Sequence, residues 1–131
     1  RQMCIRDRVE TARQKRFAQS TNVYAVKASN YKGLRRWSPV YCRNNWHIHE
    51  ADKGGGQILV CVAGRGYYQE WGKEPQELHP GDVVNIMPGV KHWHGAAPDS
   101  WFSHLAVEVP GENCRSQWCE PVSEEEYQKL K

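Results

Sequence analysis

Short apolar runs separated by turn-forming glycines and prolines fill the chain from residue 44 onward. Each run has the length of a strand, and this spacing is typical of an antiparallel sandwich or barrel. The expected strands are residues 44–49, 57–64, 66–72, 76–89, 91–96 and 101–109. The pattern therefore predicts an all-β domain, with its barrel over residues 37–122.

The two ends of the chain have different patterns. Near the end of the sequence, Ser123 is a suitable N-cap and Glu126 is its capping-box partner, so a short helix is expected over residues 123–131. At the other end, residues 9–20 have weak helical character. Residues 21–41 are expected to supply one strand and a loop.

Charge is unevenly distributed over a chain whose 131 residues suffice for one ordinary domain. Residues 1–36 hold ten Lys or Arg against two acidic residues, or +8, whereas the remainder holds eight against thirteen, or −5. This basic amino-terminal arm lacks a nucleic-acid-binding motif, so a solvated arm is favoured over a nucleic-acid partner. Residues 1–8 resemble translated ends of assembled contigs and receive no function.

Cysteine usage and hydropathy indicate the compartment. The cysteines are odd in number and have no paired metal spacing, so free thiols in a cytoplasmic protein are expected; they are Cys4, Cys42, Cys61, Cys114 and Cys119. No apolar run approaches the roughly 18 to 20 residues of a membrane span, and the start lacks the apolar stretch of a signal peptide. We expect neither a membrane partner nor secretion.

Two expected strands carry the same pattern of histidine, any residue, histidine. His47 and His49 form the first pair, and His92 and His94 form the second. Residues two apart on a strand share a face, so each pair presents two imidazoles in one direction. One such pair alone is more often solvated, but five of the six histidines lie on expected strands. Because imidazole is the commonest metal ligand among side chains, we predict a metal site.

Strand alternation suggests further candidates. Gln57 shares a strand face with Leu59 and Cys61, where it could be an ordinary buried amide. His104 suits a general base near the metal or a core histidine, and the general base is favoured. His94 is a hydrogen-bond partner of a ligand, a second acid/base or itself a ligand, and its role stays open.

Other side chains divide between core and surface. Large aromatic residues on these strands either line an apolar pocket or form the core, and core is favoured; they are Trp46, Trp93, Trp101, Tyr67 and Tyr68. His79, in a turn before Pro80, is expected at the surface.

Residues 41–96 resemble the two motifs of the cupins, G-x5-H-x-H-x3,4-E-x6-G and G-x5-P-x-G-x2-H-x3-N. The matching residues are His47, His49, Gln57 in the glutamate position, Gly64, Gly81, Gly89 and His92. The departures are Tyr41, Met87 and Ala96 in place of glycine, proline and asparagine, and seven residues between His49 and Gln57. The resemblance implies a double-stranded β-helix, or jelly-roll, barrel. The longer insert, "EADKGGG", is expected to be a flexible loop at the barrel mouth.

The segments "HPGDVV", "KHWHGAAP" and "SHLA" are similar to small bacterial cupins. That group includes manganese-dependent hydroxynitrile lyases and domains fused to carboxymuconolactone decarboxylase-like partners. The resemblance implies one divalent ion, Mn(II) before Fe, Ni or Zn, and acid/base work by His104 with His94 as a further candidate. The implied metal ligands are His47, His49, Gln57 and His92.

These observations lead to three functional hypotheses. The first is a metal-dependent lyase of hydroxynitrile lyase type that acts on a small oxygenated molecule. The alternatives are decarboxylation or isomerisation of an oxo-acid, and a non-catalytic metal- or small-molecule-binding module. Since a small barrel leaves sheet edges to cover, a homo-oligomer, a dimer or tetramer, is expected.

Overall fold

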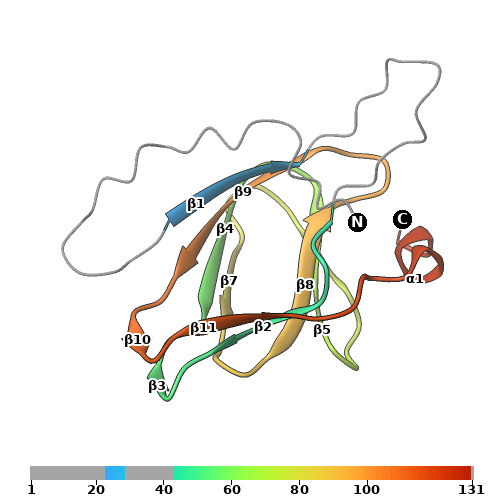
Figure 1. Cartoon of the computed structure of the whole chain (residues 1–131). Helices are drawn as coiled ribbons and strands as arrows, with labels where there is room; N and C mark the ends of the chain where they lie inside the picture. The colour runs from blue at the N-terminus through green and yellow to red at the C-terminus, as the bar shows by residue number, and fades with distance from the viewer. Residues whose placement is uncertain (1–22, 29–42, 131) are drawn as a thin grey trace.

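The computed structural model of the chain describes residues 23–28 and 43–130. In these ranges two sheets lie face to face, and a short helix lies outside one of them (Figure 1). The elements are β1 Val23–Ala28, β2 His47–Glu50, β3 Lys53–Gly54, β4 Gln57–Gly64, β5 Gly66–Glu70, β6 Gln76–Leu78, β7 Val83–Ile86, β8 Lys91–Ala96, β9 Phe102–Glu108, β10 Gly111–Glu112, β11 Arg115–Trp118 and α1 Glu124–Gln128. The predicted all-β architecture with a short C-terminal helix is confirmed.

The two large sheets are antiparallel and join strands that are distant in sequence. One sheet has the order β1-β9-β4-β7 and the other has the order β11-β2-β8-β5-β6, while β3 and β10 form a separate two-stranded ribbon. Apart from the hairpin of β5 and β6, successive strands of the two large sheets alternate between them, as in a jelly roll. This topology brings β2 and β8, which carry the two histidine pairs, side by side.

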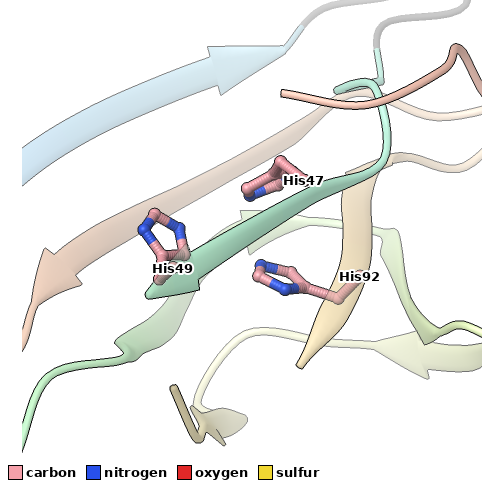
Figure 2. A group of neighbouring side chains, drawn as sticks. All are labelled: His47, His49 and His92. Atoms are coloured by element: carbon pink, nitrogen blue, oxygen red, sulfur yellow. The ribbon is translucent and has the colours of Figure 1, made fainter. Parts of the chain in front are cut away.

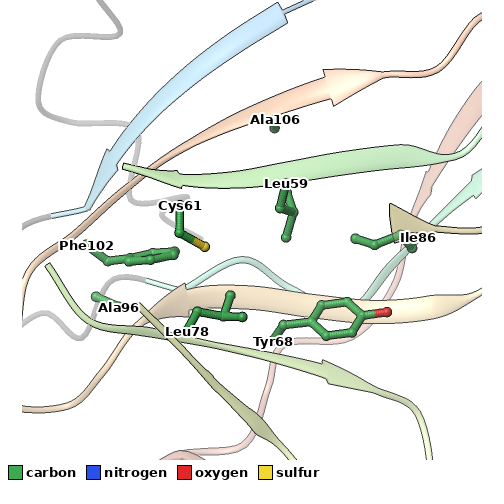
Figure 3. Packing of buried hydrophobic residues seen from close by; sticks show 8 residues of the cluster. All are labelled: Leu59, Cys61, Tyr68, Leu78, Ile86, Ala96, Phe102 and Ala106. Carbon is green, nitrogen blue, oxygen red and sulfur yellow. The ribbon is translucent and has the colours of Figure 1, made fainter. Parts of the chain in front are cut away.

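Alternating burial along the strands confirms the expected faces. On β4, Gln57, Leu59 and Cys61 are buried, whereas the residues between them are half-buried. Apolar side chains fill one part of the space between the sheets (Figure 3), and the histidines occupy another. The apolar cluster contains Leu59, Cys61, Tyr68, Leu78, Ile86, Ala96, Phe102 and Ala106. One interior therefore contains both a dry core and a polar site.

The outer face of the five-stranded sheet is covered by the end of the chain. A second apolar cluster forms there from Trp46, Tyr67, Trp93, Ala97, Val122 and Tyr127. The Tyr127 hydroxyl donates a hydrogen bond of 2.6 Å to the Ala96 carbonyl, and the guanidinium of Arg43 lies 4.1 Å from the centre of the Tyr127 ring. Helix α1 is thereby attached to the sheet.

The start of α1 follows the predicted cap. Ser123 Oγ accepts a hydrogen bond from the Glu126 amide at 3.1 Å and donates one to the Glu126 carboxylate at 2.9 Å. The helix ends at Gln128, before the predicted end, because Lys129 is its C-cap.

Several sequence expectations need correction at the level of single elements. The run 76–89 is two strands, β6 and β7, because the turn between them contains Gly81 with φ at +97°. Trp101 is 44% exposed and lies outside the core, while the other four aromatic candidates are buried. The side chain of His79 is 59% exposed, as expected of a turn residue.

The insert and the amino-terminal segment also differ from expectation. Lys53–Gly54 in the insert pairs with Gly111–Glu112, so part of the expected loop is a β-ribbon. Strand β1 confirms the one strand expected within residues 21–41, but it pairs with β9, so the sheet begins inside the segment treated as an arm. The weak helix expected over 9–20 and the first eight residues lie outside the described ranges. Among the described helices, none has the length and apolarity that crossing a membrane requires.

Candidate metal centre

Three buried histidines converge between the sheets (Figure 2). His47 and His49 come from β2, and His92 comes from the neighbouring strand β8, where it is the direct partner of His47. One ring nitrogen of each lies within 4.8 Å of those of the other two. The ring centroids of His47 and His92 are 4.2 Å apart. Such spacing suits three ligands of one ion.

Backbone carbonyls hold two of these rings. His47 Nδ1 lies 2.9 Å from the Asn45 carbonyl, and His92 Nδ1 lies 2.9 Å from the Val90 carbonyl. A carbonyl can only accept a hydrogen bond, so both Nδ1 atoms carry the proton. Each Nε2 therefore carries a lone pair, and that of His92 is buried without a partner among the described residues. Carbonyl-held imidazole of this kind is the usual arrangement of a metal-binding histidine.

His49 and Gln57 add two more uncharged side chains that could bind a metal. His49 Nδ1 lies 3.1 Å from the Ser116 hydroxyl on β11, and His49 Nε2 is buried without a hydrogen bond in the described part of the chain. Gln57 is also buried with its Oε1 unpaired, and it lies close enough to His49 to act on the pKa of that ring. Four side chains with an atom that could bind a metal thus share this part of the interior: His47, His49, His92 and Gln57.

Burial keeps the imidazoles neutral. Loss of hydration lowers the pKa of His47 to about 3, with a further lowering by His92, and it lowers the pKa of His92 to about 4. The pKa of His49 is lowered by the same cause, against the opposing charge of Glu108. Neutral imidazole is the form that binds metals, so the site needs no deprotonation near pH 7.

His94 and His104 extend the histidine cluster. Their ring centroids are 4.7 Å apart, and the His94 ring also lies 5.4 Å from that of His47. His94 Nε2 is 3.1 Å from the Asn44 side-chain amide. His104 stacks on Phe102 and has both ring nitrogens buried and unpaired within the described residues.

The six candidates from the sequence therefore occupy one region, but at different positions. His47, His49 and His92 form the triad, Gln57 lies beside His49, and His94 contacts the triad directly. His104 reaches the triad through His94. Burial lowers the pKa of His104 to about 4 and that of His94 well below its ordinary value, so both rings are neutral.

A cleft of about 420 Å³ opens next to His49. Its walls include Glu108 from β9, Cys114 before β11, and Arg115 and Ser116 on β11. Sequence reasoning missed Ser116 and Glu108. Glu108 ends a predicted strand and is the register partner of Gln57. By contrast, the polar sequence of β11 gives no strand signal, so nothing in it places Ser116 beside a histidine.

The chain is similar to a known lyase and to two solved structures. A scan against models of protein families finds no match. Over 87 residues the chain is 42% identical to an (R)-mandelonitrile lyase of Granulicella tundricola, a match that covers 66% of this chain. The chain spans 63% of the length of that relative.

Solved structures show the same barrel. A cupin-like protein of Thermotoga maritima is 38% identical, with a TM-score of 0.65 over 84% of this chain and 72% of that one. A double-stranded β-helix protein of Klebsiella pneumoniae is 19% identical, with a TM-score of 0.59 over 79% of this chain and 77% of that one. The second likeness concerns the fold alone.

Proposed function

This chain belongs to the cupin family, and on that premise we propose that it is a metal-dependent lyase that cleaves a small cyanohydrin into an aldehyde and hydrogen cyanide. The observation that carries the proposal is the triad of buried imidazoles, with nitrogens within 4.8 Å of one another. The likeness to a mandelonitrile lyase supports the choice of reaction. Fold alone would leave the reaction open, because one fold hosts many chemistries.

The donor set fits a divalent ion. His47, His49 and His92 would supply imidazole nitrogens, and Gln57 would supply an amide oxygen. The amide oxygen suits Mn(II), which we favour, and the imidazoles also suit Fe, Ni or Zn. When bound, the ion supplies Lewis acidity toward a substrate oxygen, undiminished by a carboxylate because Gln57 replaces the glutamate of the family motif.

His104 moves the proton in this proposal. Its neutral ring takes the proton of the substrate hydroxyl, and the electron pair of that O–H bond forms the carbonyl. The bond from carbon to cyanide breaks, and its electrons leave with cyanide. His104 then returns the proton to cyanide, so the products are an aldehyde and hydrogen cyanide and the ring is restored.

His94 is suited to position His104 and to serve as a second acid/base. Its ring lies between His104 and His47, and the Asn44 amide holds one of its nitrogens. His94 is buried, so its ring faces other imidazoles and the Asn44 amide rather than water. This arrangement supports a role beside His104.

Turnover of (R)-mandelonitrile by protein loaded with Mn²⁺ tests the proposal. We expect release of benzaldehyde and hydrogen cyanide, no release by metal-free protein, and loss of most bound metal in His92→Ala by elemental analysis. The exposed His79→Ala variant is the matched control and should keep metal and activity. Full metal content in His92→Ala would remove the triad from the site.

Two other results would overturn the lyase assignment. Turnover of an oxo-acid with no action on cyanohydrins would indicate a decarboxylase or isomerase. Tight binding of benzaldehyde without turnover by the metal-loaded protein would indicate a binding module.

A further inference from the structure

We propose that Ser116, on edge strand β11, is a positioning residue that holds the ring of His49 at its Nδ1 side and so fixes the orientation of that ring. Ser116 is the direct register partner of His49 across the β11–β2 ladder, and its Oγ lies 3.1 Å from His49 Nδ1. The inference rests on the proposed metal site. It adds a residue outside the histidine motif and outside the strands that the sequence predicts.

The three triad histidines are held in two different ways. His47 and His92 each bond the backbone carbonyl of the residue two positions earlier, Asn45 and Val90. A substitution cannot remove those carbonyls. His49 instead depends on a side chain that comes from another strand, so one substitution can release it.

A hydroxyl can either donate a hydrogen bond to Nδ1 or accept one from Nδ1–H, and the second arrangement suits a metal ligand. When Ser116 Oγ accepts a hydrogen bond from Nδ1–H, His49 Nε2 carries the lone pair that a metal needs. The Nε2 atom of His49 is buried without a hydrogen bond among the described residues, so it is available to a metal. Among the hydrogen bonds of the described residues, the contact with Ser116 is the one that holds the ring at its Nδ1 side.

Strand β11 supports both ligands of β2. Trp118 is the register partner of His47, and their ring centroids are 4.9 Å apart. All four residues of β11 are exposed, and Ser116 also lines the cleft beside His49. An exposed edge strand thus controls a buried ligand, and metal affinity should depend on its side chains.

Substitution at Ser116 tests the inference through metal affinity. We expect Ser116→Ala to raise the dissociation constant for Mn²⁺ by about 10- to 100-fold, the usual loss when the hydrogen-bond partner of a ligand is removed. Ser116→Thr keeps the hydroxyl and should restore most of the affinity. Gln117→Ala is the control, because it lies on the same exposed strand with its side chain on the opposite face. Competition with a chelator of known affinity measures each constant.

The outcomes separate this inference from the metal site itself. Unchanged affinity in Ser116→Ala, when the wild-type protein binds Mn²⁺, overturns the inference alone. An equal loss in Gln117→Ala, or no recovery in Ser116→Thr, indicates a general effect on β11 and also overturns it. A wild-type protein that binds no Mn²⁺ overturns the proposed site and this inference together. Metal-free melting temperatures should stay alike in all variants.

Discussion

His104 has an unusual environment for a polar side chain. Both ring nitrogens are buried and unpaired among the described residues, while the ring stacks on Phe102 and touches His94. A buried polar group without a partner costs free energy, typically about 1 to 3 kcal/mol. A functional role accounts for such a cost, because a bound substrate can supply the missing partner.

Replacement of His104 by alanine distinguishes an acid/base from a core residue. As an acid/base, His104→Ala should keep the bound metal and lower turnover by about 10² to 10⁴. If His104 is a core residue, its replacement should instead lower the free energy of unfolding by about 1 to 3 kcal/mol and leave turnover in the folded fraction nearly intact. Metal content, melting temperature and turnover should be measured together. An intact rate constant with a depressed melting temperature would assign the proton transfer elsewhere.

The buried imidazoles also predict how pH acts on the metal-free protein. The pKa of His104 is about 4 in the folded chain and 6.5 in its ordinary state. As pH falls through 6.5, the unfolded chain takes up the proton first, so the folded state loses stability until pH approaches 4.

Urea unfolding at a series of pH values in the presence of a chelator measures this effect. The free energy of unfolding should decrease steadily below pH 6.5. His104→Leu removes one of the titrating groups, so its decrease should be shallower. An equal slope in the two proteins would show that His104 does not titrate as the burial requires.

Among the strands, the alternation of side chains between two faces accounts for most of what the sequence predicts correctly. Trp93 lies opposite His92 and His94, and the structure buries it on the outer face as alternation requires. The ribbon of β3 and β10 and the strand β11 escaped prediction, because short polar segments lack a periodic apolar signal. The partner of His49 depends on cross-strand register, which follows from tertiary packing rather than local sequence.

The glycine before Gln57 offers a test at this scale. Gly56 has φ at +97°, and a Cβ there would lie 2.3 Å from the Ile86 carbonyl oxygen. Gly72 also has positive φ, at +76°, but a Cβ there meets no atom within 4 Å. Gly72→Ala should cost about 1 kcal/mol from its backbone conformation, and Gly56→Ala should cost more because β4 or β7 must also shift.

Urea unfolding of the two alanine variants compares these costs. Displacement of β4 in Gly56→Ala should also move Gln57 and weaken Mn²⁺ binding, whereas Gly72→Ala should bind the ion normally. Equal stabilities for the two variants would contradict the close approach of Gly56 to β7.

For the whole molecule, the outer faces of the two sheets differ. The tail and α1 cover the five-stranded sheet, but the outward positions of the four-stranded sheet form a largely apolar surface. Val62 and Val83 are 52% and 62% exposed, and Met87, which contacts Asn85 at the other end of β7, is 59% exposed. The remaining outward residues of β4, β7 and β9 are Ile58, Val60, Asn85, Ser103, Leu105 and Val107. Large apolar patches of this kind mark interaction surfaces.

We expect a second copy of this chain to cover that surface. The outward residues of β4, β7 and β9 are all uncharged. Two copies can therefore associate through these residues without burying a charged group. A dimer or larger assembly should therefore form through the four-stranded sheet.

Light scattering of charge variants tests this association. Val62→Lys and Val83→Lys should yield monomers, and Gln76→Lys, at an exposed position on β6 of the other sheet, should leave the assembly intact. A wild-type protein that stays monomeric at about 10 μM, roughly ten times a micromolar dissociation constant, would contradict the expectation.

The position of β11 and α1 late in the chain gives the domain an order of assembly during synthesis. Every histidine leaves the ribosome before Ser116, and Trp93 stays uncovered until Tyr127 has emerged. Chains are made at about 5 to 20 residues per second, so the nascent barrel spends seconds with its imidazoles unsupported on the β11 side. The metal-binding region is thus completed late in synthesis, and the outer cluster around Trp93 closes after it.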